Sequence, residues 1–267
     1  MRLNSDLLLI ALLLISLFGP CCGQKIYEFS YNKDLPVLAS SVSLTLGSEI
    51  IERTKKPISE EFVSNLNRSR VIKFDRSTLN NYSTKSGNHS DIFKNMAFVA
   101  PFTLMASKQG RENFKEILGM YSEVILLNGS LTYFTKALVG RVRPYAYNPE
   151  VDLSKKLQRT TRRSFFSGHV SHVSSLSFFT AKVFNDLYPD SNYKYLVWGG
   201  AAAIPALTGY LRYKSGAHFP SDVIIGYGVG AAVGIFIPSL HKIKVKKSDS
   251  YFSFNGNSVG FFCSLNN

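Results

Sequence analysis

The sequence predicts an all-α fold, a bundle of about six helices followed by a small C-terminal β-hairpin. Apolar segments of helix length recur along the chain, and none of them alternates apolar and polar residues as a half-buried strand does. Apolar residues make up 45% of the 267 residues, which is enough to build a core of that size. The expected helical segments are Leu35–Ile51, Phe93–Ser107, Phe114–Thr135, Phe165–Leu187, Tyr195–Leu211 and Val223–Leu240.

The N-terminal residues 1–23 have the pattern of a secretory signal peptide. The apolar run Leu7–Phe18 has the length of the hydrophobic part of such a signal, and small residues follow it. Cleavage after Gly23 would release an exported chain. Two alternatives stay open at this point: acylation of Cys21 or Cys22, and an uncleaved membrane anchor.

Three further regions follow the signal peptide. Residues 24–92 are expected to contain one helix and a polar loop region, and residues 93–241 the remaining helices. Residues 242–267 form a basic tail in which alternating apolar residues flank Asn255-Gly256, a dipeptide typical of a two-residue hairpin turn. We expect this hairpin to pack on the helical bundle.

The long polar stretch Glu52–Asn95 is rich in Asn, Ser, Thr and Gly, which favours loops and helix caps. Asp91 precedes an apolar segment and indicates the start of a helix. Asp75 and Arg76 could form a buried pair or belong to a loop, and Asp75 is interpreted as a loop residue. His89 and His241 lie in polar surroundings and are expected at the surface.

Two of the apolar segments bear on membrane association. Val223–Leu240 has 18 residues without a charge, and Leu196–Leu211 has 16. A spanning helix needs about 18 or more such residues. The earlier segments carry charged or ionisable residues, namely Lys94, Glu123, His169, His172 and Lys182. This profile fits a buried bundle and a shallow membrane bundle almost equally well, and we interpret it as membrane association.

The charge balance favours an anionic partner. The chain carries 31 Lys and Arg against 18 Asp and Glu, a formal net charge of +13. Such an excess attracts nucleic acid, acidic lipid headgroups or phosphorylated substrates. The sequence contains no nucleic-acid-binding motif and no zinc-ligand spacing, so we expect no nucleic-acid partner.

One segment, Leu211–Asp222, combines three kinds of chemistry. Asp222 follows His218 by four residues, so its carboxylate can reach the imidazole across one helical turn and fix its tautomer. Arg212 offers a planar fork of donors that suits an oxyanion. The alternative is a helix entry with Pro220 in the first turn and a structural histidine. Alone, the segment does not decide between a nucleophile and a helix start.

A second cluster pairs Lys136 with Arg143. Seven residues are two turns of a helix, so both cations are expected on one face, and Pro144 is expected to end that helix. Two such cations can converge on one anion, although a solvated basic face is the simpler interpretation. Arg141 is expected to point elsewhere, toward the surface or a lipid headgroup.

A third cluster begins another helix. Ser167 and Gly168 stand where free backbone N–H groups and the helix dipole favour an anion, and Gly168 lets the backbone approach it closely. His169 is a candidate proton donor to a leaving group. An ordinary serine cap followed by a packed histidine is the alternative. His172 is interpreted as structural or supporting.

The three clusters, in this order, resemble the type 2 phosphatidic acid phosphatase (PAP2) superfamily, which includes bacterial class A acid phosphatases and vanadium haloperoxidases. The family pattern reads K-x6-R-P, then P-S-G-H, then S-R-x5-H-x3-D. The resemblance covers about residues 90–240. Phe166 replaces the family proline and Leu211 the family serine, which alters the surroundings of the expected phosphate pocket.

The resemblance implies a role for each matching residue. His218 is expected to attack phosphorus, Asp222 to orient it, and His169 to protonate the leaving group. The phosphate is expected to be held by Lys136, Arg143, Ser167, Gly168 and Arg212. No metal and no other cofactor is expected, although vanadate can bind as a phosphate mimic. The resemblance also implies a PAP2-type helical bundle with its site between helices.

The leading hypothesis is therefore an exported, metal-independent phosphatase that hydrolyses phosphomonoesters or lipid phosphates and diphosphates through a phosphohistidine. Its partners would be a phosphorylated substrate and a membrane, with the site facing outward from the periplasm or cell envelope. Two alternatives are a vanadate-dependent haloperoxidase and a non-catalytic phosphate- or lipid-binding membrane protein.

Overall fold

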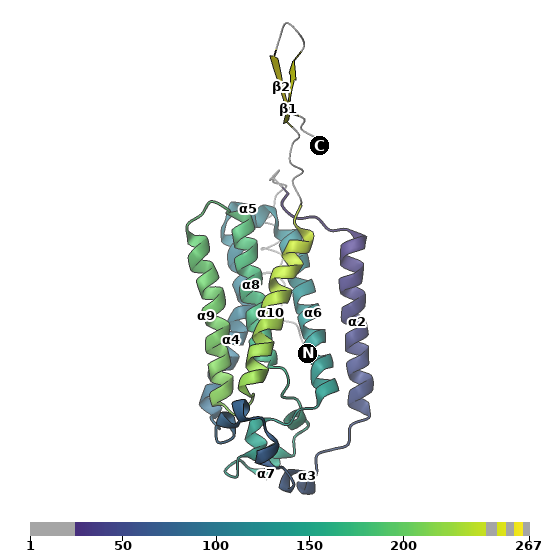
Figure 1. Cartoon of the computed structure of the whole chain (residues 1–267), viewed down its shortest axis with the longest axis vertical. Helices are drawn as coiled ribbons and strands as arrows, with labels where there is room; N and C mark the ends of the chain where they lie inside the picture. The colour runs from purple at the N-terminus through teal and green to yellow at the C-terminus, as the bar shows by residue number, and fades with distance from the viewer. Residues whose placement is uncertain (1–24, 244–249, 255–258, 264–267) are drawn as a thin grey trace, which may run out of the picture.

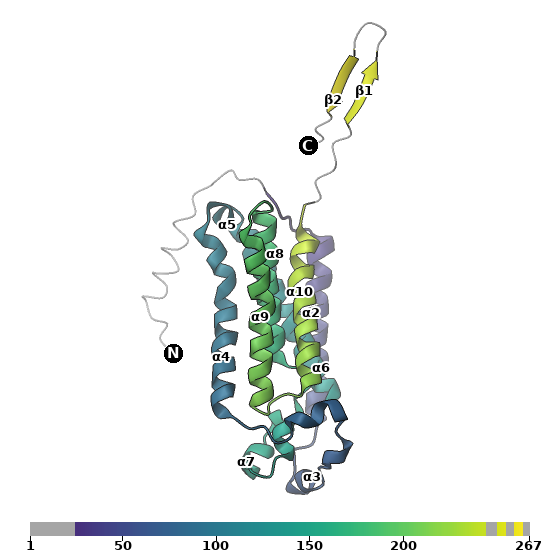
Figure 2. The ribbon, with the colours of Figure 1, turned by 60° about the vertical axis from the view of Figure 1, so that its left-hand side comes forward.

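Six long helices run side by side as a bundle, so the predicted all-α fold is confirmed (Figures 1 and 2). The computed structural model describes residues 25–243, 250–254 and 259–263; the expected signal peptide lies outside these residues. The long helices are α2 (Tyr31–Arg53), α4 (Thr84–Val99), α6 (Phe114–Val139), α8 (Gly168–Leu187), α9 (Tyr193–Lys214) and α10 (Pro220–His241).

Short helices cap the two ends of the bundle. Figure 1 shows α3 and α7 at the end that we call the loop end, and α5 at the opposite end, which we call the hairpin end. The short α-helices are α3 (Glu60–Ser64), α5 (Lys108–Glu112) and α7 (Leu153–Lys156). The 3-10 helices are η1 (Arg68–Arg70), η2 (Lys73–Thr78), η3 (Ala100–Ala106), η4 (Pro144–Tyr147) and η5 (Arg159–Arg162).

Helix α8 lies at the centre and packs against α10, α9, α6 and α4. Its apolar residues are buried on several faces, as expected for a helix that is surrounded by others. The centre of the core joins residues of α8 to residues of α6 and α10: Val173, Leu176, Phe179, Val183, Met120, Val124 and Ile237.

Close contact between α8 and α10 depends on glycine. A Cβ atom added at Gly230 would lie 2.2 Å from the carbonyl oxygen of Ser171. A Cβ atom at Gly234, one turn later, would lie 2.2 Å from the carbonyl oxygen of Ser175. Real Cβ atoms do not come so close to backbone oxygens, so the two helices meet backbone to backbone along this stripe.

Helix α2 has its polar side turned inward. Its four buried residues are Val37, Ser41, Ser48 and Glu52, so three of the four are polar. Its large apolar side chains are exposed instead: Leu35, Leu38, Val42, Leu46 and Ile50. This is the reverse of an amphipathic helix on a water-soluble bundle.

Among the described helices, α10 alone is long and apolar enough, by length and composition, to cross a membrane. It corresponds to the predicted uncharged segment Val223–Leu240. Large apolar side chains are also exposed on α9 and α10 themselves, namely Leu196, Ile204, Leu207, Ile224, Ile225 and Phe236. The outer surface of the bundle is therefore apolar along several helices.

The C-terminal hairpin is confirmed as two antiparallel strands, β1 (Ser250–Phe254) and β2 (Val259–Cys263). The predicted turn dipeptide Asn255-Gly256 lies outside the described residues. In both views the hairpin lies beyond the end of the bundle (Figures 1 and 2). The expectation that it packs on the bundle is therefore wrong.

Two expected helix boundaries are also wrong. Helix α4 begins at Thr84, because the side chain of Ser83 caps it by accepting a hydrogen bond from the Ser86 N–H, so part of the expected polar loop is helical. Helix α6 ends at Val139, because Gly140 adopts a positive φ of 58°. Polar residues that face a site resemble loop residues in composition, which explains the first error.

The glycine stripe leads to a prediction on stability. Gly230→Ala and Gly234→Ala should each lower the free energy of unfolding by roughly 1–3 kcal/mol, because the new methyl group forces α8 and α10 apart. The midpoint of thermal unfolding in detergent measures the effect. Gly228→Ala is the matched control, because nothing lies within 4 Å of a Cβ atom there. An equal loss in all three variants would contradict the close packing.

Candidate active site

A cavity of about 360 Å³ opens at the loop end, where α6 ends and α8 begins. Five residues predicted from the three clusters line it: Lys136, Arg143, Gly168, His169 and His218. The wall also includes Lys94, Phe98, Thr132, Tyr133, Thr160, Arg163 and His172. Segments that are far apart in the sequence therefore meet around one hollow that is rich in cations and histidines.

The last turn of α6 carries Lys136, which is 8% exposed. Its Nζ donates to the carbonyl oxygens of Arg163, at 2.8 Å, and Phe166, at 2.6 Å. The expectation that Arg143 lies on the same helix is wrong, because α6 ends before it and Arg143 precedes η4. Both cations still reach the cavity, since the chain turns back after Gly140.

The first turn of α8 follows Ser167 directly. Ser167 is completely buried, and its backbone N–H donates to the carbonyl oxygen of Asp222 at 3.0 Å. A Cβ atom at Gly168 would lie 3.0 Å from Cγ2 of Thr132, so the absence of a side chain lets α8 approach α6 closely. The free N–H groups of this helix end lie beside the cavity, where they favour an anion.

His169 has a partner that the sequence did not indicate. Its Nε2 lies 2.5 Å from Oδ1 of Asp91 in the middle of α4. Asp91 was expected to start that helix, so this role was missed. Its separation of 78 residues from His169 leaves no local spacing by which to find it. His172, which we expected to be structural or supporting, also lines the cavity, with Nδ1 2.7 Å from the carbonyl oxygen of Gly168.

A tight loop between α9 and α10 positions His218, which is 1% exposed. The loop contains Gly216 at a positive φ of 67°, where an added Cβ atom would lie 2.0 Å from the carbonyl oxygen of Asn81. The Gly216 carbonyl oxygen accepts a hydrogen bond from the Tyr145 N–H at 2.9 Å. Just before the loop, Arg212 donates to the hydroxyl of Ser90 on α4 at 3.2 Å.

Asp222 is held by several donors at the start of α10. Its carboxylate accepts hydrogen bonds from the hydroxyl of Ser164 at 2.5 Å and from the Phe219 N–H at 3.0 Å. Its distance to His218 is longer: Oδ2 lies 3.8 Å from Nδ1, which is an ion-pair distance and not a hydrogen bond. Asp222 therefore lies beside His218, as its spacing predicts, but does not bind the ring directly in this structure.

Arg141 was expected to point toward the surface or a lipid headgroup, and this prediction is wrong. Its guanidinium donates to Asp222 at 2.6 Å and to Asp75 at 2.6 Å, and it stacks 4.2 Å from the ring centre of Phe219. The prediction assumed that Arg141 lies on the same helix as Lys136, but α6 ends at Val139, before Arg141.

Asp75 is likewise no free loop residue: it is completely buried within η2. Its carboxylate accepts hydrogen bonds from the Ser221 N–H at 3.0 Å and the Ser221 hydroxyl at 2.7 Å, in addition to Arg141. Together, Asp75 and Arg141 clamp the segment between His218 and Asp222 from outside the cavity. Neither residue belongs to the three sequence clusters.

Unpaired polar atoms gather at this site. Among the described residues, eight buried side-chain nitrogen or oxygen atoms have no hydrogen-bond partner. Four of the eight belong to predicted site residues: Oγ of Ser167, Nε of Arg143, Nε of Arg212 and Nδ1 of His218. Buried polar atoms are normally paired, so this concentration points to a polar ligand. The Ser167 hydroxyl and the Nε–H groups of Arg143 and Arg212 can all donate, which indicates an anion, whereas Nδ1 of His218 faces the carboxylate of Asp222.

The surroundings of His218 keep its ring neutral. Burial lowers the pKa of His218 well below its usual value of 6.5, and the cations Lys136, Arg143 and Arg212 lower it further. A neutral imidazole has a free lone pair and can act as a nucleophile.

Comparisons with known proteins agree with the motifs. Residues 118–246 match the family model described as the PAP2 superfamily. The chain is 28% identical over 148 residues to a curated lipid A 4'-phosphatase from Porphyromonas gingivalis. That match covers 55% of this chain and 58% of the relative, so it spans little more than half of the relative's length.

Among solved structures, the chain is similar to the transmembrane PAP2 type phosphatidylglycerolphosphate phosphatase from Bacillus subtilis. The sequence identity is 20% and the TM-score is 0.45. The match covers 74% of this chain and 94% of that one.

The clamp on the His218 segment can be tested by removing Arg141. Arg141→Ala should lower the free energy of unfolding by about 3 kcal/mol, because it leaves the buried carboxylates of Asp75 and Asp222 without their shared cation. Thermal unfolding measures this loss. Adding Asp75→Asn should restore part of the stability, since it removes one of the two unpaired charges. Arg70→Ala, at an exposed arginine of the same loop region, is the control and should change little.

Proposed function

The chain belongs to the PAP2 superfamily, and on that premise we propose that it is a phosphoric ester hydrolase that removes phosphate from phosphorylated lipids. The observation that carries the proposal is the group of unpaired, buried donors around His218. Lys136, Arg143 and Arg212 all lie close enough to act on that histidine electrostatically. A phosphate group matches this arrangement in charge and in its number of acceptor oxygens.

The first step that we propose is attack by His218. The lone pair of its ring nitrogen forms a bond to phosphorus while the bond between phosphorus and the lipid oxygen breaks. The leaving oxygen takes a proton from His169 and departs as an alcohol. The cations and the N–H groups at the start of α8 would hold the three remaining phosphate oxygens during this transfer.

The second step that we propose is hydrolysis of the phosphohistidine. Water gives a proton to His169 and attacks phosphorus, and the bond to His218 breaks to regenerate the neutral ring. The contact between Asp91 and Nε2 of His169 would orient the imidazole for these proton transfers. Asp222 would tighten its contact with His218 as the ring becomes positive, since hydrogen bonds at such sites are often long before substrate binds.

No metal ion is required in this scheme. A metal would act in such a reaction by neutralising the negative charge that develops on the transferred phosphoryl group. Lys136, Arg143 and Arg212 supply that positive charge from the protein itself. Arg163, which also lines the cavity, adds a fourth cation at its edge.

We further propose that the bundle lies in a membrane. The inverted polarity of α2 supports this, because an apolar outer face and a polar inner face suit a lipid surround. The apolar length of α10 agrees. The cavity lies at one end of the bundle, where a lipid headgroup can reach it from the membrane surface. Export and an outward-facing site remain part of the proposal.

The proposal predicts that His218→Ala abolishes hydrolysis, with a loss of about 10⁴-fold or more, because no other group replaces the nucleophile. Phosphate release is measured with chelator present, from detergent-solubilised lipid phosphates and diphosphates and from small phosphoesters. His89→Ala, at an exposed histidine, should retain activity. Undiminished turnover in His218→Ala would overturn the mechanism. Phosphate binding without turnover on any substrate, or halide oxidation on adding vanadate, would favour another function.

The lowered pKa of His218 predicts the pH dependence of hydrolysis. The lowered pKa keeps the His218 ring neutral at pH values somewhat below 6.5, its usual pKa. The acid limb of kcat/KM should therefore lie below pH 6.5. The phosphate of the substrate also titrates in this range. Two substrates with different phosphate pKa values separate the effects, because the limb that belongs to His218 keeps its position in both profiles. A limb at or above pH 6.5 with both substrates would contradict the lowered pKa.

A further inference from the structure

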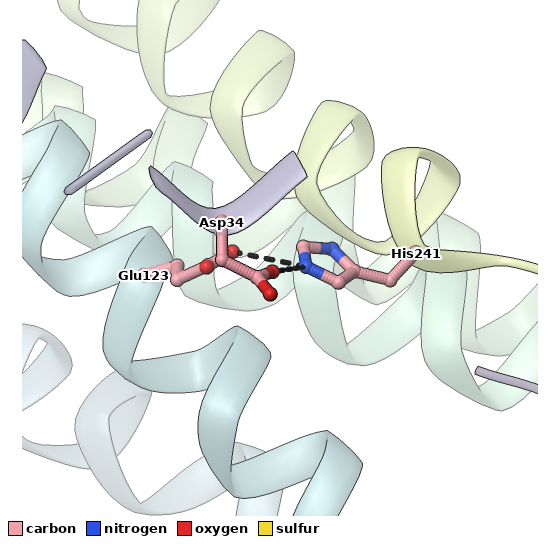
Figure 3. Close-up of side chains that lie close together, drawn as sticks. All are labelled: Asp34, Glu123 and His241. Atoms are coloured by element: carbon pink, nitrogen blue, oxygen red, sulfur yellow. Dashed lines mark hydrogen bonds and ion pairs between the residues drawn. The ribbon is translucent and has the colours of Figure 1, made fainter. Parts of the chain in front are cut away.

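Three ligand-type side chains meet at the hairpin end of the bundle, far from the cavity. Asp34 comes from the first turn of α2, Glu123 from α6 and His241 from the last turn of α10. Figure 3 shows the three side chains pointing toward one another. Nε2 of His241 lies 2.7 Å from Oδ1 of Asp34 and 3.4 Å from Oε2 of Glu123. His241, which we expected at the surface, is completely buried.

The tautomer of His241 is set from the other side of its ring. Nδ1 lies 2.9 Å from the carbonyl oxygen of Ile237. A carbonyl oxygen only accepts hydrogen bonds, so Nδ1 carries a proton and donates it. A hydrogen bond from Nε2 to Asp34 at 2.7 Å needs a second proton on the ring, and a metal ion would replace that proton and bind the Nε2 lone pair. A histidine that ligates a metal is commonly oriented by this kind of hydrogen bond to a backbone carbonyl.

Two carboxyl groups face one imidazole at this point. Within the described part of the chain, the ion pairs of Asp34 and Glu123 are with His241 alone. Glu123 is 5% exposed, and its Oε2 is buried without a hydrogen-bond partner. An uncompensated carboxylate at such a depth is costly.

We propose that Asp34, Glu123 and His241 bind a divalent transition-metal ion, for which Zn²⁺ is the probe. The ligand atoms lie within 4.8 Å of one another, so one ion can contact all three. Imidazole nitrogen and carboxylate oxygens are both zinc ligands, and the imidazole disfavours Mg²⁺ and Ca²⁺. The Asp34 side chain is 21% exposed, which leaves a path for the ion and room for water ligands.

The ion would act on the fold and not on the reaction. The cluster and His218 lie at opposite ends of α10, and a helix of 22 residues is about 33 Å long. Helix α2 buries one apolar residue, Val37, among the four residues on its inner side. A metal bridge would therefore fasten α2, whose main neighbour is α6, to α10 as well. Phe29 packs edge-on against the His241 ring, with 4.8 Å between ring centres, and covers one side of the site.

The test uses the full chain in detergent, stripped with a chelator and then titrated with Zn²⁺. One equivalent of zinc should remain after desalting, measured by elemental analysis, and the thermal midpoint should rise by about 5 °C or more. Glu123→Gln and Asp34→Asn should each reduce zinc affinity at least about tenfold, because each loses a charged ligand. Glu116→Gln, on the same helix but outside the cluster, is the matched control and should bind as the native chain does.

Two results would overturn the site: no equivalent of zinc bound by the native chain, or binding unchanged in both ligand variants. If a variant fails to fold, the comparison of stripped and reloaded native protein still decides the question. Hydrolysis by the stripped protein, assayed well below its thermal midpoint, should equal that of the reloaded protein. Loss of hydrolysis on stripping would contradict a purely structural role for the metal. The effect of His218→Ala tests the proposed function instead, so the two results can fail independently.

Discussion

The bridge from Arg141 to two buried carboxylates, Asp75 and Asp222, is the contact on which the loop end depends. Each carboxylate is completely buried, so each needs a partner to remain charged. The planar guanidinium contacts both at once and stacks on Phe219. Because Asp75 also binds the backbone of the first turn of α10, the bridge holds that helix start, and with it His218, against the rest of the bundle.

Helix α2 has its polar side toward the bundle, and large apolar side chains are exposed along several of the described helices. Helix α2 turns serines and Glu52 inward and leaves leucine, isoleucine and valine exposed. In water, the hydrophobic effect would favour the opposite orientation. In lipid, the outer face costs nothing, and polar contacts and close packing of small residues hold the helices together. The proposed membrane placement would therefore account for the inward polar side of α2.

The helices could be predicted from local spacing, whereas the residues of the three clusters were identified through their joint resemblance to the PAP2 pattern. His218 precedes Asp222 by four residues, and Val223–Leu240 is recognisable by its lack of charge. Arg141 and Asp75 could not be found in this way, because 66 residues separate them and nothing local links them. The prediction that His241 lies at the surface was wrong for a related reason. Its basic neighbours in the sequence are typical of a solvated segment, whereas its partners come from two other helices.

The packing of α8 against α10 connects the fold to the site. Ser167, just before α8, donates its backbone N–H to the carbonyl oxygen of Asp222 in the first turn of α10. A Cβ atom at Gly226 would lie 2.7 Å from the Ser167 carbonyl oxygen, so the glycine stripe of α10 extends to the edge of the cavity. The distance between the start of α8 and the histidine before α10 is therefore set by backbone contact. Side chains at the site can then be exchanged, as Phe166 and Leu211 have been relative to the family pattern, while the spacing of the chemical groups is kept.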